Sequence, residues 1–341
     1  MPEADETLPA APVAASAEPK GFAPDELSTC DSCLRANAPT RTQCLYCGAE
    51  LRSKRSGLRP AAFPDAEPES NRIYIVARAR AGRSIANSVV DQLAARFQFK
   101  PAELQAGIST AGLLPLTSAS REQVPELLSV LHDYGFEAFS IPASDVQTLT
   151  AARKIRMLEF TETTMSALTT SPVQQLRASW SDLVLIVLGR LQTSRVEVDE
   201  RQSRSAIKHL DRRELSNDES VVDLYPKSGT AWRIGANDFD FSCLGDRKSL
   251  TAFDNLRALI DLLIRRSGAE FNDAFARIRP LLGVVWPLEI STSKGRSHRP
   301  RASRKDVSVV TATDNTTQFN NYSRLAWSVR ILELQSQRLD G

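Results

Sequence analysis

The sequence predicts a multidomain α+β protein with a small cysteine-rich module on a flexible N-terminal arm, a β-α-α-β-α-β sandwich, and a mostly-β, barrel-like domain with C-terminal helices. Three observations support this fold class. Four of the five cysteines crowd into a short polar segment that is too small to bury a core. Residues 72–141 alternate between strand-length apolar runs and helical apolar periodicity. Residues 150–245 consist mainly of short strand-like runs separated by turn residues.

Composition and charge narrow the class of protein. The 43 basic and 41 acidic residues nearly cancel, and the 42% apolar content is enough to build cores. No apolar run reaches the ~18 residues that a membrane-spanning helix needs. The acidic N-terminus has the pattern of neither a signal peptide nor a transit peptide. We therefore expect a cytoplasmic protein with no transmembrane segment, in a compartment where cysteines stay reduced.

Shifts in composition predict the domain boundaries. The first part of the chain is rich in Ala, Pro and Glu, which is typical of disorder. Prolines recur just after the cysteine-rich module, so we expect the module to be tethered rather than docked. The expected parts are disordered residues 1–26, the module at 27–51, a linker at 52–70, an α/β sandwich at 71–145, a β-rich domain with a C-terminal helix at 150–290, a basic disordered loop at 291–306, and a strand and terminal helix at 307–336.

The cysteines Cys30, Cys33, Cys44 and Cys47 form two CxxC pairs separated by ten residues. Zinc binds four thiolates tetrahedrally, and two such pairs close one shell of ligands. Metal binding would also supply the folding free energy that so polar a segment lacks. The alternatives are two disulfide bonds, a redox-active CxxC pair, or iron. We predict one structural Zn²⁺, because disulfides suit secreted domains and a redox motif needs one pair beside a βαβ unit.

This segment resembles the bacterial zinc ribbon over residues 30–48. Asn37 and Gly48 match the usual form of that knuckle, whereas Leu34 stands where its first glycine is usual. The same spacing is similar to the Ran-binding-protein type of zinc finger, a family that binds ubiquitin or single-stranded RNA. Ser28 occupies the position of that family's Trp, which counts against this second resemblance. The resemblance to the ribbon implies a metal site and does not identify a partner.

Residues 71–145 predict a small α/β sandwich. Apolar residues Ile85, Val89 and Leu93 recur on one helical face, and Gly135 ends a later helix. The elements expected in order are a strand at 73–76, a helix through Phe97, a short helix at 101–108, a strand at 113–117, a helix ending at Gly135, and a strand at 136–141.

The order β-α-α-β-α-β over residues 72–143 resembles the C-terminal domain of the bacterial ribosomal stalk protein and the Clp-protease adaptor fold. The nearest likeness is in residues 113–120, the helix that follows, and residues 133–141. Those families are protein-docking modules, so the resemblance implies docking rather than catalysis.

The β-rich domain is predicted from alternating polarity. A hairpin is expected where Pro226 and Gly229 separate two runs, a charged loop at 199–219, and a helix that begins after Thr251 and ends at Gly268. The expected strands cover residues 156–160, 183–188, 195–198, 221–225, 230–234 and 239–244. Strands followed by one amphipathic helix resemble a pleckstrin-homology-like barrel over residues 153–267. That resemblance implies loops that bind peptides or lipid headgroups, and the early loops lack a basic cluster for headgroups.

After this domain, we expect helical residues up to Pro280, an apolar run through Trp286, an edge strand at 307–311, and a terminal helix at 314–334. The fifth cysteine, Cys243, lies in an apolar setting and is expected to be a buried, inert thiol.

The sequence offers no catalytic constellation. The three histidines, His132, His209 and His298, have no nucleophile nearby in sequence, and no phosphate-binding or hydrolase motif occurs. We therefore expect a non-enzymatic zinc-binding protein that mediates protein–protein interaction as an adaptor or scaffold. The alternative is a nucleic-acid-binding protein that uses the zinc module and the basic segments 51–60 and 294–305.

Overall fold

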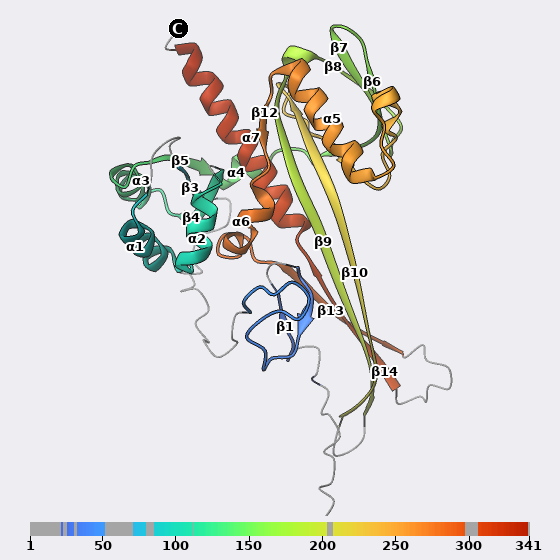
Figure 1. Ribbon diagram of the computed structural model, residues 1–341. Helices are drawn as coiled ribbons and strands as arrows, with labels where there is room; N and C mark the ends of the chain where they lie inside the picture. The colour runs from blue at the N-terminus through green and yellow to red at the C-terminus, as the bar shows by residue number, and fades with distance from the viewer. Residues whose placement is uncertain are drawn as a thin grey trace, which may run out of the picture.

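The computed structural model describes residues 22, 26–30, 33–51, 71–79, 85–110, 112–202, 207–296 and 306–339 (Figure 1). Most of the N-terminal segment predicted to be disordered, the linker predicted at 52–70, and residues 297–305 of the basic segment lie outside the described residues. The described part is a mixed α+β protein, as predicted. Within it, no helix combines the length and the apolar character needed to span a membrane.

Two long strands, β9 (Leu183–Gln202) and β10 (Ile207–Pro226), form a hairpin that runs along the molecule (Figure 1). They pair antiparallel from Leu183 opposite Pro226 to Gln202 opposite Ile207. The prediction of a charged loop at residues 199–219 is therefore wrong. Pairing satisfies the backbone groups of the described residues, and most of the polar side chains from Arg212 to Asp218 are exposed.

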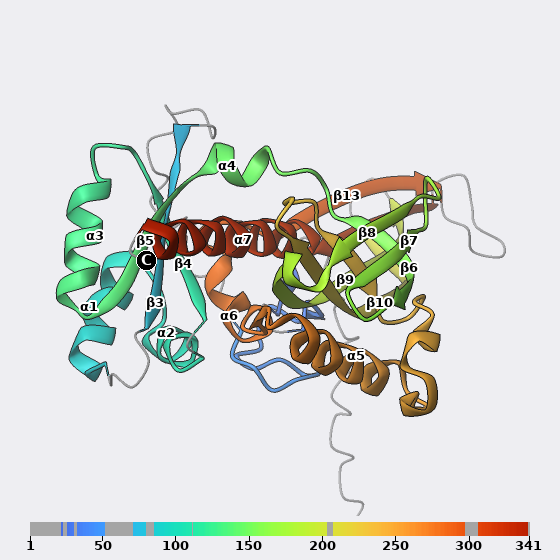
Figure 2. The ribbon, with the colours of Figure 1, turned by 90° about the horizontal axis from the view of Figure 1, so that it is seen from above.

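The whole hairpin belongs to one sheet, whose upper part curls around helix α5 (Ala252–Ser267) (Figure 2). The sheet order is β13-β14-β9-β10-β11-β6-β7-β8, where β13 is Glu289–Arg296 and β14 is Asp306–Asp314, and β11 pairs with β6 in parallel. Its remaining strands are β6 (Arg153–Phe160), β7 (Thr164–Thr169), β8 (Gln175–Ser179), β11 (Trp232–Gly235) and the short β12 (Glu270–Asn272) beside β9. The pleckstrin-homology-like resemblance stays a prediction.

Local signals place α5 as predicted. The side chain of Thr251 accepts a hydrogen bond from the Asp254 amide at the helix start, and Gly268 ends the helix with φ 67°. The strand predicted at 239–244 is wrong, because Phe241–Arg247 forms a 3-10 helix. The Asp240 side chain accepts from the Ser242 amide and starts this turn, while Phe239 and Phe241 both bury against the α5 core.

The α/β sandwich has the element order that the sequence predicted. Its sheet order is β4-β3-β5, with β3 antiparallel to both neighbours. The elements are β3 (Ile73–Ala79), α1 (Asn87–Phe97), α2 (Pro101–Ile108), β4 (Leu113–Ala119), α3 (Val124–Asp133), β5 (Phe136–Pro142) and the short α4 (Ala143–Gln147). The resemblance to the stalk-protein and Clp-adaptor folds stays a prediction.

Helices α6 (Phe275–Leu282) and α7 (Thr316–Leu339) join the sandwich to the hairpin. One continuous core contains residues of the sandwich, both helices and β9. Within it the ring of Tyr74 meets that of Trp286 edge to face at 5.2 Å. The predicted terminal helix is confirmed, and it lies in the middle of the molecule (Figure 2).

The antiparallel pair of strands β13 and β14 differs from the prediction. β14 (Asp306–Asp314) lies between β9 and β13 (Glu289–Arg296), so the edge strand is β13 and not residues 307–311. Residues 291–296 belong to β13, and the prediction of a disordered loop there is wrong. All eight residues of β13 are exposed. Because no side of this strand is buried, its sequence lacks the alternation of apolar and polar residues from which a strand is predicted.

We expect the substitution Gly189→Ala to lower the free energy of unfolding by about 1–3 kcal/mol. A Cβ at this position of β9 would collide with the ring of Phe319 on α7, at the centre of the shared core. Gly283→Ala is the control, because nothing lies within 4 Å of its Cβ position. Urea unfolding of the three proteins measures the effect, and equal stability of all three would contradict this packing.

Candidate metal centre

Two matching turns bring the cysteines of the module together. The amide of Leu34 donates to the Cys30 carbonyl at 2.8 Å, and the amide of Gly48 donates to the Cys44 carbonyl at 3.0 Å. Leu34 and Gly48 both have positive φ, 57° and 72°. Leu34 therefore adopts the backbone that a glycine would usually supply, and its side chain is buried. The short strands β1 (Ser28–Thr29) and β2 (Ala36–Asn37) pair beside the first turn.

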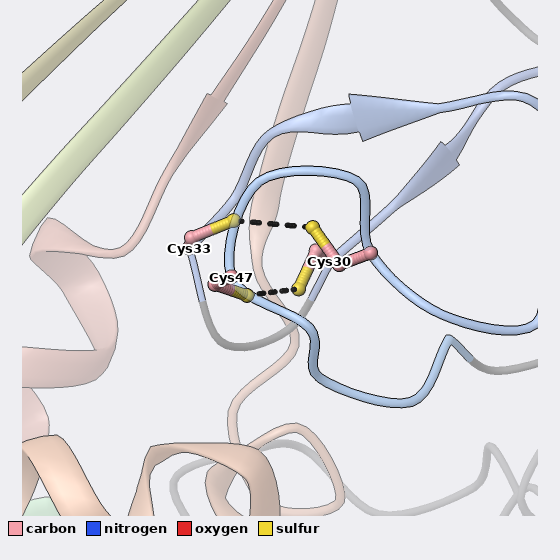
Figure 3. Close-up of side chains that lie close together, drawn as sticks. Cys30, Cys33 and Cys47 are labelled. Atoms are coloured by element: carbon pink, nitrogen blue, oxygen red, sulfur yellow. Dashed lines mark hydrogen bonds between the residues drawn. The ribbon is translucent and has the colours of Figure 1, made fainter.

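The four sulfur atoms lie in one cluster (Figure 3). All are within 4.8 Å of one another, and the pairs Cys30–Cys47 and Cys33–Cys44 are both 3.6 Å apart. A tetrahedral centre with metal–sulfur bonds of about 2.3 Å places its sulfurs about 3.8 Å apart. A disulfide bond would need about 2.05 Å. The four predicted ligands are thus positioned to bind one metal ion.

Hydrogen bonds around Cys44 favour its ionised form. Burial of Cys44 disfavours its thiolate and raises its pKa. Hydrogen bonds to its sulfur from the backbone amides of Tyr46 and Cys47 and from the Asn37 side chain outweigh this effect and lower the pKa to about 6. Burial raises the pKa of Cys33. A metal ligand must be a thiolate, so Cys44 is ready to bind at neutral pH.

Asn37 fixes the position of this ligand. Its side-chain oxygen accepts from the Leu45 amide at 2.9 Å, and its nitrogen donates to the Arg35 carbonyl at 2.9 Å and to Cys44 Sγ at 3.5 Å. The sequence singled out Asn37 as a match to the ribbon pattern. Its contact with a ligand sulfur becomes evident only from the fold.

The module is docked on the rest of the protein, so the prediction of a merely tethered module is wrong. Leu27 and Ala36 pack against Val196 and Val198 on the lower half of β9. Figure 1 shows the module beside this half of the hairpin. The side chain of Glu214 on β10 accepts hydrogen bonds at 3.3 Å from the Ala36 amide and from the Tyr46 hydroxyl.

The other candidate residues do not gather into a site within the described part of the chain. His132 lies in the last turn of α3, His209 lies in β10, and His298 is outside the described residues. Cys243 is half-buried in the 3-10 helix, and burial raises the pKa of its thiol to about 11, which fits the prediction of an unreactive side chain.

We expect Val198→Asp to detach the module from the hairpin, because it would bury a carboxylate among Leu27, Ala36 and Val196. Hydrogen–deuterium exchange of residues 26–51 should become faster than in the unchanged protein. Arg195→Ser, on the same strand but with an exposed side chain, serves as the control. Exchange of the module that stays slow in Val198→Asp would contradict the docked arrangement.

The chain matches no protein-family model, no curated protein and no solved structure. The resemblances described above therefore rest on residue spacing and element order alone.

Proposed function

We propose that this chain is a non-enzymatic protein that binds one structural zinc ion and acts as an adaptor or scaffold through protein–protein contacts. The observation that carries the proposal is the cluster of four sulfur atoms. An all-sulfur donor set suits zinc or iron and is unsuited to magnesium or calcium. Four protein ligands leave no open position for a substrate, which is the arrangement of a structural zinc site.

The docked position of the module supports a structural role for the ion. Zinc would hold the two turns together, and the residues that contact the hairpin lie in these turns or next to them in the module. Ala36 and Tyr46, which contact Glu214, both lie in this segment. Loss of the ion would therefore loosen the contact between the module and the β9–β10 hairpin, as well as the module itself.

An exposed apolar groove supports the proposal of protein–protein contact. It has a volume of about 310 Å³ and lies between α5 and β12. Two of its lining residues are large and apolar yet exposed, Phe253 by 57% and Phe271 by 38%. Arg257 and Asp261 add charge to the lining. Exposed apolar patches with polar rims are typical of surfaces that bind other proteins.

We expect the purified chain to contain one zinc per molecule by elemental analysis. Cys30→Ser combined with Cys33→Ser should reduce this to well under one, because two of the four ligands are lost. Cys243→Ser is the matched control and should keep the zinc, since Cys243 is not part of the sulfur cluster. Iron in place of zinc, or no metal, would contradict the proposal.

We expect Phe253→Glu to reduce binding of protein partners recovered with the full chain by at least about tenfold, because it places a charge in the apolar groove. Leu332→Glu is the control, since Leu332 is also exposed but lies on α7, outside this groove. Quantitative pull-down with both variants measures the effect. Equal recovery of partners by Phe253→Glu and the unchanged chain would place the contact elsewhere.

Nucleic-acid binding remains the second candidate, and one observation favours it. Lys294 and Arg296 are exposed at the end of β13, while the other residues of the two basic segments, apart from Leu51 and Gly295, lie outside the described part. Against it, the ring of Tyr46, which is the aromatic side chain in the zinc module that could stack on a base, is already covered. The Arg35 guanidinium lies 4.6 Å from the centre of this ring, and the Tyr46 hydroxyl donates to Glu214. Affinity for RNA or single-stranded DNA that falls steeply with salt would support this candidate, and a flat response would exclude it.

A further inference from the structure

Arg279 is a buried cation in α6 that forms no ion pair with any carboxylate in the described part of the chain. The residue is 6% exposed. One guanidinium nitrogen donates to the side-chain oxygen of Gln192, while Nε has no hydrogen-bond partner. Burying a charge without a partner is strongly unfavourable, so a group that offsets this cost is expected nearby.

One acidic candidate, Asp218, is already engaged. Asp218 forms an ion pair with Arg190, with contacts of 2.5–2.9 Å, and also accepts from Gln192 at 3.2 Å. Gln192 itself is neutral, so it satisfies a hydrogen bond of Arg279 without balancing the charge. The chain around α6 therefore explains where Arg279 is held but not why a cation is there.

The cysteines of the metal centre offer a second source of negative charge for Arg279. Burial lowers the pKa of this arginine, and the negative charge that Cys30 and Cys33 carry when ionised acts against that shift. Figures 1 and 2 both show the module directly against α6. Cys30 is fully buried. A divalent ion bound by four thiolates keeps a formal charge of −2, which attracts a cation across a poorly solvated contact.

We propose that Arg279 is the countercharge of the tetrathiolate metal centre, so that the loaded centre stabilises the buried guanidinium and the guanidinium tightens the binding of the ion. The inference rests on the proposed zinc binding. It makes Arg279 a positioning residue outside the ligand shell, and it couples metal loading to the docking of the module on α6. The sequence separation of more than 200 residues between Cys30 and Arg279 hides this partnership from any local pattern.

The first test is the zinc affinity of the full-length chain, measured by competition with a chromophoric chelator. Arg279→Met should bind zinc about 10- to 100-fold more weakly, which is the usual effect of losing a partner outside the ligand shell. Arg279→Lys keeps the charge and should lose less. Arg277→Met is the matched control on the same helix, where Arg277 is exposed and pairs with Asp273, and its affinity should be unchanged.

The second test separates a countercharge from a merely structural role. In the zinc-loaded protein, Arg279→Met should lower the melting temperature. In a metal-free background made by Cys44→Ser and Cys47→Ser, the same substitution should leave the melting temperature unchanged or raise it, because it then removes an uncompensated buried charge. A role confined to the hydrogen bond with Gln192 predicts a loss in both backgrounds, and that result would overturn the inference.

The outcomes distinguish the inference from the proposed function. If the unchanged chain holds no zinc, the proposed function fails and the inference falls with it. If the unchanged chain holds one zinc and Arg279→Met binds zinc equally tightly, the inference alone is overturned. Weaker binding by Arg279→Met, intermediate binding by Arg279→Lys and unchanged binding by Arg277→Met would support it.

Discussion

The antiparallel pairing of β9 with β10 is the constraint on which the other elements depend. Side chains of a strand alternate between its two faces, so one hairpin can serve two cores. Leu185 and Val187 of β9 face the core shared with α7 and the sandwich, whereas Ile186 faces the core around α5. On β10, Tyr225 faces the core shared with α7 and the sandwich, and Leu224 faces the core around α5. A slip of one residue would exchange these faces, so the two cores together hold the register.

A buried polar network fastens α7 to this sheet. Both oxygens of Asp223 accept from the Arg233 guanidinium at 2.7 Å, and Ser323 on α7 donates to Asp223 at 2.7 Å. Tyr225 and Ser323 are joined at 2.9 Å, and the Arg233 guanidinium lies 4.9 Å from the centre of the Phe319 ring. Because each charge has a partner, the network can sit in the core without an unpaired ion, and it selects one position of α7 along the hairpin.

The metal centre uses the lower half of the same hairpin. Its two turns have matching hydrogen bonds, and its outer residues pack on Val196 and Val198 or bond to Glu214. A zinc site of this kind is usually considered a local fold stabiliser. Here the proposed zinc would hold together a module that contacts β9 and β10, and the proposed countercharge on α6 would extend that coupling to the centre of the protein.

Local chemistry was readable from the sequence alone. The CxxC spacing predicted which four cysteines would gather, Thr251 and Gly268 bounded α5, and the element order of the sandwich followed from apolar periodicity, because each signal depends on residues a few positions apart. Only the tertiary structure decided the features whose partners are distant. The charged residues 199–219 became strands through pairing across the hairpin, β13 formed without any buried face, and the module docked on residues more than 150 positions away. The proposed pairing of Arg279 with the metal centre belongs to the same class, since a buried charge is balanced by the groups that surround it in space and not by its neighbours in the chain.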